Sequence, residues 1–115
     1  MKYKIIATYK GETFSFIAKE KTWWLQRSNI AGIVLSKNTA NFKAKLAIIT
    51  MFKPSLIGHE AIHIYQARKL GWRYLPKYLW EWARAGFKYR ENIMEQEAFQ
   101  NEHIVDWHIE LDIKI

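Results

Sequence analysis

The residues of this chain best suited to chemistry are two histidines and a glutamate in the pattern H-E-x-x-H: His59, Glu60 and His63. In an α-helix, residues four positions apart lie one above the other on one face. The imidazoles of His59 and His63 could therefore reach a single point, with Glu60 turned about 100° from His59 and flanking it. This pattern is typical of zinc hydrolases, in which the histidines bind the metal and the glutamate acts on a water molecule.

A third metal ligand must come from elsewhere in the chain. A catalytic zinc site has three protein ligands, and this chain has no cysteine, so the third ligand must be a carboxylate or a histidine. Glu95 and Glu97 open a predicted helix, but they are two positions apart and face different ways, so only one can bind the metal. Spacing alone leaves both open. His103 and His108 share no helix face, and we expect structural or surface roles for them, with His103 as a distant reserve ligand.

Helices must position these side chains. We predict a helix from about Ser55 to Lys69 that carries the motif, with Gly71 just beyond its end. Its apolar residues lie almost all round, which indicates a buried helix whose polar residues need partners. A second helix is predicted at about 72–87, where large apolar residues recur at helical spacing. A third is predicted from about residue 92 to Trp107.

The N-terminal part predicts strands. Residues 3–9 and 13–18 flank a turn at 10–12 and indicate a β-hairpin. Residues 29–36 predict another strand, which we expect to be internal or protected; at a sheet edge it could pair with an extended peptide. The apolar residues 44–52 fit a helix or a strand, and residues 109–115 favour a last strand. We therefore expect one α+β domain over residues 1–115, with a small antiparallel or mixed sheet packed on the motif helix and two further helices.

Composition narrows the possible partners. The formal net charge is +7, but no block of five like charges occurs, which favours a solvated basic surface over a nucleic-acid site. No apolar run approaches the roughly 18 residues of a membrane span, so no membrane partner is expected. The first ten residues alternate lysines with apolar residues and resemble no signal peptide, so we expect a cytoplasmic protein. The oligomeric state is left open.

Two segments together resemble a known family. The motif segment from His59 to Gln66, the Trp- and Tyr-rich helix after it and the segment 89–98 are similar to the gluzincin metallopeptidases, above all to the very small phage and bacterial minigluzincins. In that group an Asn and an Ala bracket the ligand Glu, as Asn92 and Ala98 bracket Glu95 here. The resemblance covers about residues 46–102. It implies a minimal zincin core, a zinc ion bound by His59, His63 and Glu95, and Glu60 as the general base.

The chain departs from the family pattern at two positions. Ile93 stands where a proline is usual, and Phe99 stands where many gluzincins have an aspartate that holds a ligand histidine. Hydrogen-bonding support for the histidines must then come from elsewhere. Gln66, three residues after His63, is one candidate, and a surface contact is equally compatible with its position. Tyr89 and Tyr78 are the candidates for stabilising an oxyanion, although a packing role is favoured for both.

The expected function is that of a zinc-dependent peptidase acting on a peptide or protein substrate. One alternative is a catalytically weak or inactive zincin-fold protein that serves as an interaction module, because a chain of 115 residues leaves little room for a second lobe around a substrate. A further alternative is a basic nucleic-acid-binding domain in which Trp72 and Tyr74 lie among the contact residues.

Overall fold

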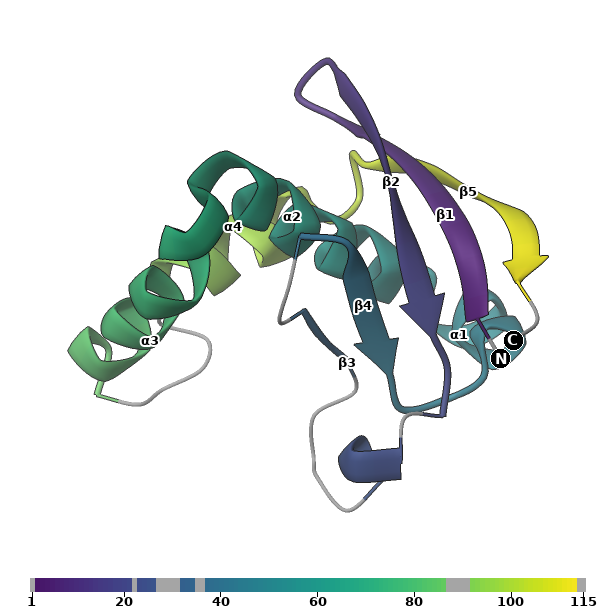
Figure 1. The fold of residues 1–115 in the computed structure, drawn as a ribbon, viewed down its shortest axis with the longest axis horizontal. Coiled ribbons are helices and arrows are strands. Elements are labelled where there is room, and N and C mark those ends of the chain that lie inside the picture. The colour runs from purple at the N-terminus through teal and green to yellow at the C-terminus, as the bar shows by residue number, and fades with distance from the viewer. Residues whose placement is uncertain (1, 22, 27–31, 35–36, 87–91, 114–115) are drawn as a thin grey trace.

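The computed structural model describes residues 2–21, 23–26, 32–34, 37–86 and 92–113 (Figure 1). Within these ranges the strands are β1 (Lys2–Tyr9), β2 (Glu12–Lys19), β3 (Gly32–Val34), β4 (Thr39–Phe42) and β5 (Asp106–Ile113). The helices are α1 (Leu46–Phe52), α2 (Ser55–Leu70), α3 (Tyr74–Arg84) and α4 (Ile93–Asn101), with short 3₁₀ turns η1 (Trp23–Leu25) and η2 (Gly71–Arg73). The predicted α+β class is confirmed. Among the described residues, no helix has both the length and the apolar character that crossing a membrane requires.

A hairpin forms the centre of a mixed sheet with the strand order β3-β4-β2-β1-β5. Lys10 and Gly11 both have positive φ, 51° and 76°, as the two-residue turn that best joins twisted antiparallel strands requires. β5 pairs antiparallel with β1, and β4 pairs parallel with β2. The predicted hairpin and the predicted C-terminal strand are therefore confirmed, whereas β4 was not predicted.

The strand expected in residues 29–36 appears as β3 at the edge of the sheet. Among the described residues it pairs with β4 alone, in antiparallel orientation. The strand was expected to be internal or protected, and the internal position was wrong for the segment Gly32–Val34. Residues 29–31 and 35–36 lie outside the described residues. An edge strand has backbone N–H and C=O groups that no neighbouring strand satisfies.

The structure also decides one ambiguous segment and changes one predicted helix end. The ambiguous segment 44–52 contains the helix α1, and α4 ends at Asn101 rather than near Trp107. Asp106 and Trp107 instead pair with Thr8 and Ala7 of β1. Backbone pairing across about a hundred residues of sequence thus replaces the last turns of the predicted helix, which local propensity could not foresee.

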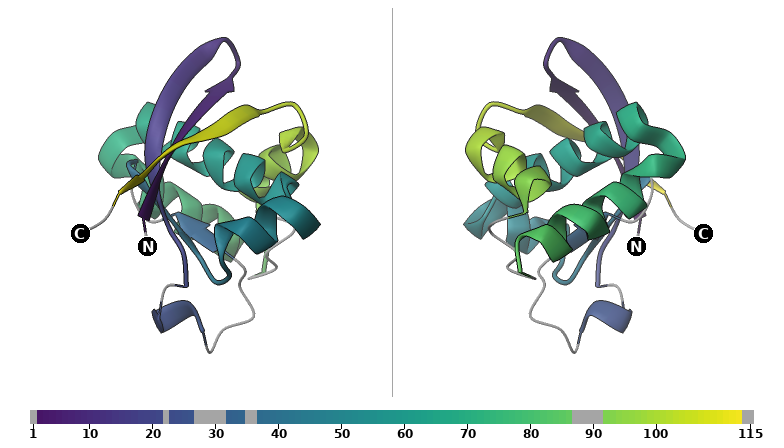
Figure 2. Two further views of the ribbon diagram at one scale, coloured as in Figure 1. Left: turned by 90° about the vertical axis from the view of Figure 1, so that its right-hand side faces the viewer. Right: turned by 90° about the vertical axis from the view of Figure 1, so that its left-hand side faces the viewer.

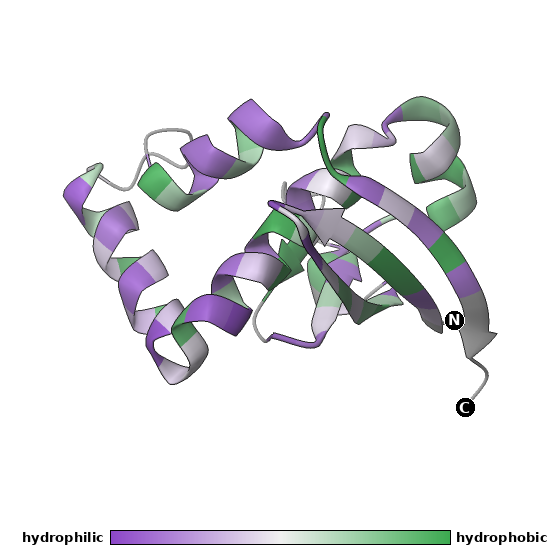
Figure 3. Cartoon of the chain, turned by 90° about the horizontal axis from the view of Figure 1, so that it is seen from above, coloured by the Kyte–Doolittle hydropathy of each residue, from purple (hydrophilic) through white to green (hydrophobic). Residues whose placement is uncertain are grey.

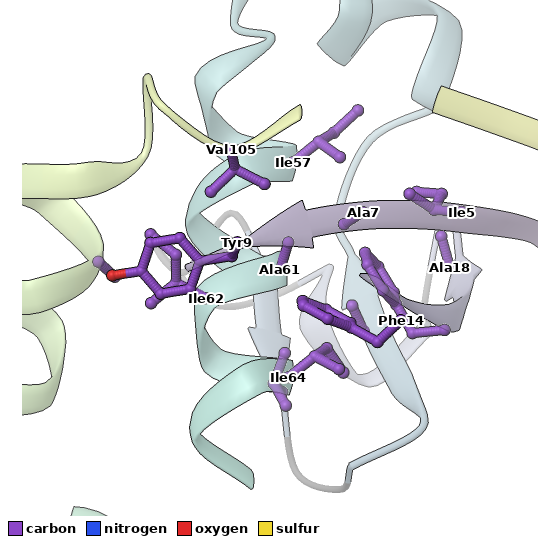
Figure 4. Packing of buried hydrophobic residues seen from close by; sticks show 14 of the residues in the cluster. Ile5, Ala7, Tyr9, Phe14, Ala18, Ile57, Ala61, Ile62, Ile64 and Val105 are labelled. Atoms are coloured by element: carbon purple, nitrogen blue, oxygen red, sulfur yellow. The ribbon is translucent and has the colours of Figure 1, made fainter. Parts of the chain in front are cut away.

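The core lies between the sheet and α2, which crosses the twisted strands obliquely (Figures 1 and 2). Along β1 and β2 every second residue is buried, because successive side chains point to opposite faces of a strand. Figure 4 shows this packing around Tyr9, Phe14, Ala61 and Ile64. Figure 3 shows hydrophilic and hydrophobic residues interleaved along α3 and α4. Both helices contact α2, and α3 leaves large apolar side chains at the surface, among them Leu79 and Trp80.

Candidate metal centre

The two motif histidines lie side by side on α2 and are buried. Their ring centroids are 5.1 Å apart, and each residue is only 3% exposed. The spacing of four residues stacks the rings on one face of the helix, as predicted. Nε2 of His59 lies 2.8 Å and Nε2 of His63 lies 2.9 Å from the same atom, Oε1 of Glu95. The structure thus brings together the three residues that the family resemblance implied as metal ligands.

Glu95 reaches the histidines because α4 is fixed at its first turn. Asn92 caps the helix, since its Oδ1 accepts from the backbone N–H of Met94 at 2.9 Å. The Asn92 amide also donates to the carbonyl oxygen of Tyr78 on α3, at 3.1 Å. The Tyr78 hydroxyl in turn donates to Oε2 of Glu95. Both oxygens of the Glu95 carboxylate are therefore engaged, one by the histidines and one by Tyr78.

The charges of these groups depend on one another. Burial alone would raise the pKa of the Glu95 carboxyl, but hydrogen bonds from His59 and His63 hold it well below its usual range. Burial alone would lower the pKa of His63, but its hydrogen bond with Glu95 and the negative charge of that residue raise it. Glu95 is therefore a carboxylate anion between two imidazoles, and a carboxylate with two imidazoles is a common donor set for a divalent metal.

Potential ligand atoms from His59, His63 and Glu95 lie within 4.8 Å of one another, and all three residues are buried. Glu97 is not in this group, so the choice between Glu95 and Glu97 that spacing left open is decided by packing. His103 is exposed, and His108 lies exposed on β5, in agreement with the structural or surface roles predicted for them. His103 is likewise not in the group of potential ligands.

Glu60 lies beside the two histidines but bonds to neither. It is 1% exposed, and within the described part of the chain its Oε2 has no hydrogen-bond partner. Burial raises the pKa of Glu60 to about 7, against the opposing effect of the nearby His63 and His59. On its other side Glu60 adjoins Gly32 of β3, where an added Cβ would lie 3.4 Å from Cδ of Glu60. A buried carboxylate oxygen without a hydrogen-bond partner is costly and calls for a functional explanation.

Of the two tyrosines that the sequence offered for stabilising an oxyanion, the structure describes one. Tyr78 is at the site, but its hydroxyl is committed to Glu95 and so supports a ligand carboxylate. Tyr89 lies outside the described residues. The structure shows Tyr78 donating to a predicted ligand, and the oxyanion role of either tyrosine stays a prediction.

Gln66 is a buried neighbour of the site and not a surface residue. Its Oε1 lies 2.8 Å from Nδ1 of His63, and its amide nitrogen donates to Met94 and Glu97. Of the two interpretations left open by the sequence, the structure supports contact with a ligand histidine.

Two neighbours of His59 come from the later part of α4 and the turn after it. The ring of Phe99 packs on the His59 ring, with centroids 4.6 Å apart, and Oε1 of Glu102 lies 3.8 Å from Nδ1 of His59. The sequence analysis did not single out Glu102. Its position seven residues after Glu95, two helical turns on the same face, was a signal that could have indicated it.

No protein-family model, curated protein or solved structure gave a significant match to this chain.

Proposed function

We propose that this chain is a zinc-dependent peptidase in which His59, His63 and Glu95 bind the metal and Glu60 is the general base. The observation that carries the proposal is the convergence of the three buried ligand groups within 4.8 Å, on two helices far apart in sequence. Catalytic zinc sites commonly have this composition, two histidines and a glutamate, with the fourth position left for water.

The donor set fits the proposed metal. Imidazole nitrogen and carboxylate oxygen are zinc ligands, and their deprotonated forms are the ones that bind. Two histidines and one carboxylate also form the site of some non-haem iron enzymes, so the identity of the metal has to be measured. The adjacent glutamate favours hydrolysis, because Glu60 offers a base beside the ligands.

Bound zinc would supply Lewis-acid polarisation of the peptide carbonyl and increase the acidity of a water molecule. Glu60 would take a proton from the attacking water and deliver it to the leaving amine. The unpaired Oε2 of Glu60 supports this role, because no described side chain or backbone group competes for it. Burial keeps the proton transfer away from bulk solvent.

The edge strand β3 supports a peptide substrate. Gly32 of β3 lies against the carboxyl group of Glu60, so the edge of the sheet runs next to the proposed base. An extended peptide that added to this edge would pair through its backbone, largely independently of its side chains. This arrangement would bring a peptide bond close to Glu60.

Metal analysis tests the proposed ligands. We expect the purified protein, after dialysis against equimolar zinc and iron, to retain about one equivalent of zinc by elemental analysis. His59→Ala should lose the bound zinc, whereas His103→Ala, which removes an exposed histidine, should keep it. A folded protein that retains no metal would contradict the proposal. Selective retention of iron would also contradict it and would indicate an oxidative enzyme instead of a zinc peptidase.

Activity separates a peptidase from an inactive metal-binding protein. The zinc-loaded protein is incubated with denatured casein, and new peptide termini are identified by mass spectrometry. Glu60→Gln should abolish the cleavage and leave zinc binding intact, because Glu60 is the proposed base and not a ligand. Zinc binding without any Glu60-dependent cleavage of casein would favour the interaction module over the peptidase.

A further inference from the structure

Gln66 makes three polar contacts from a buried position on α2. Its Oε1 lies 2.8 Å from Nδ1 of His63, and its Nε2 lies 3.0 Å from the carbonyl oxygen of Met94 and 2.8 Å from Oε1 of Glu97. The residue is 7% exposed. Its side-chain amide thus connects a ligand histidine on α2 with the backbone and a side chain of α4.

The orientation of this amide follows from the chemistry of its neighbours. A backbone carbonyl only accepts hydrogen bonds, and so does an ionised carboxylate. The Glu97 carboxylate is paired with Lys10 Nζ at 3.2 Å and accepts from the Tyr9 hydroxyl at 2.9 Å. Turning the Gln66 amide over would place its oxygen against two acceptors. The NH₂ group must therefore face Met94 and Glu97, and Oε1 must face His63.

Because Oε1 can only accept, Nδ1 of His63 must carry the hydrogen. Without metal, Nε2 also donates to Oε1 of Glu95, 2.9 Å away. A neutral imidazole has one N–H, so once a metal replaces the proton on Nε2, that nitrogen offers its lone pair while Nδ1 keeps its hydrogen. On this basis, and resting on the metal site proposed above, we propose that Gln66 is the positioning residue of His63. It fixes the ring and the Nδ1–H tautomer, so that Nε2 is presented as a metal ligand.

Glu97 holds Gln66 in place from outside the ligand group. While its Oε1 accepts from Gln66, its Oε2 accepts from the Tyr9 hydroxyl at 2.9 Å and from Lys10 Nζ at 3.2 Å. Figure 4 shows the Tyr9 hydroxyl directed away from the sheet. A chain of contacts thus runs from the end of β1 through Glu97 and Gln66 to His63. Histidine ligands commonly depend on such an acceptor, here a neutral amide and not a carboxylate.

The first test is the zinc affinity of Gln66→Ala, measured by competition with a chromophoric chelator. We expect affinity about 10- to 100-fold weaker than in the parent, as for other lost partners of ligand histidines. Gln96→Ala, which removes an exposed glutamine from α4, is the matched control and should bind zinc like the parent. Parental affinity in Gln66→Ala would overturn the inference while leaving the zinc site intact; a parent that binds no zinc would overturn both proposals.

A spectroscopic readout distinguishes positioning from packing. In ¹H–¹⁵N spectra of the zinc-loaded parent, the Nδ1–H proton of His63 should be visible and protected from exchange with water, because Gln66 accepts it. In Gln66→Ala this resonance should broaden or vanish, whereas Gln96→Ala should leave it unchanged. A resonance equally protected in Gln66→Ala would contradict the assigned hydrogen bond.

Exchanging the amide of Gln66 and the carboxylate of Glu97 tests whether zinc affinity can be rescued. Gln66→Glu alone would place a second carboxylate against Glu97, and we expect weak zinc binding from their repulsion. Combined with Glu97→Gln, the pair has one carboxylate facing His63 and one amide donating to that carboxylate. Affinity should then return part of the way to that of the parent, because the Met94 carbonyl still faces a carboxylate oxygen. This double variant also decides the matter if Gln66→Ala fails to fold. No gain in the double variant over Gln66→Glu would count against the inference.

Discussion

Oε1 of Glu95 lies 2.8 Å from Nε2 of His59, although the two residues are 36 positions apart in the sequence. The same oxygen contacts His63, and the other oxygen of the carboxylate accepts from Tyr78. A buried carboxylate held from both sides is preorganised, and preorganised ligands lose little entropy when they bind a metal. This relationship allows the proposed metal centre to be tested residue by residue.

The choice of Glu95 over Glu97 is tested by paired amide substitutions. Glu95→Gln should weaken zinc binding by at least about a hundredfold, because a neutral amide replaces an anionic ligand. Glu97→Gln should have a much smaller effect, since Glu97 acts only through Gln66. Chelator competition measures both affinities. The reverse order, with Glu97→Gln the more damaging, would show that the wrong glutamate has been assigned.

Tyr78→Phe removes the hydroxyl that donates to Glu95. Loss of a hydrogen-bond partner of a ligand typically weakens metal affinity by about 10- to 100-fold, and we expect an effect in this range. Tyr74→Phe is the control, because the Tyr74 hydroxyl donates to the Val34 carbonyl, at 3.4 Å, and to no proposed ligand among the described residues. Isothermal titration calorimetry measures the zinc affinity of both variants. Equal affinity in both variants would mean that the contact of Tyr78 with Glu95 does not support the metal.

Gly58→Ala tests the approach of the end of α4 to α2. On helix propensity alone, alanine should stabilise this helical position by about 1 kcal/mol. An added Cβ would lie only 2.3 Å from the carbonyl oxygen of Glu102, so one of the two segments must shift. Overpacking of this kind costs about 1–3 kcal/mol and exceeds the gain in propensity. Chemical denaturation should show a lower free energy of unfolding, and a higher one would refute the close contact.

Glu60→Gln should stabilise the metal-free protein at mildly alkaline pH. The substitution replaces a buried carboxylate that has an unpaired oxygen with a neutral amide, which costs less to bury. Residues selected for function are often destabilising in this way, and a gain of about 1 kcal/mol is expected. Urea denaturation in the presence of a chelator measures it.

Glu81→Gln is the matched control for that experiment. Glu81 is also a buried acid, but its Oε1 accepts from Arg84 at 3.0 Å. Its replacement removes this ion pair and should bring no gain in the free energy of unfolding. Equal gains in Glu60→Gln and Glu81→Gln would indicate a general effect of lower negative charge and not a specific cost at Glu60.

Local signals in the sequence were sufficient for the elements whose geometry is local. Lys10 and Gly11 form the predicted hairpin turn, and α2 begins at the predicted Ser55 and ends next to the predicted Gly71. The strand β4 was not predicted, because the segment Thr39–Phe42 has a weak pattern and gains its conformation from pairing with β2 and β3.

In the candidate site, too, some features follow from local sequence and others from tertiary packing. The spacing of His59 and His63 determines by helix geometry alone that their rings share a face, and Asn92 marks the start of the helix that carries Glu95. The family resemblance implied Glu95, whereas spacing left Glu95 and Glu97 open. Which face of α4 meets α2 depends on long-range packing, and the tertiary structure placed Glu95 against the histidines and Glu97 against Gln66. Periodicity sets directions within one helix, whereas contacts between helices depend on how their buried surfaces fit together.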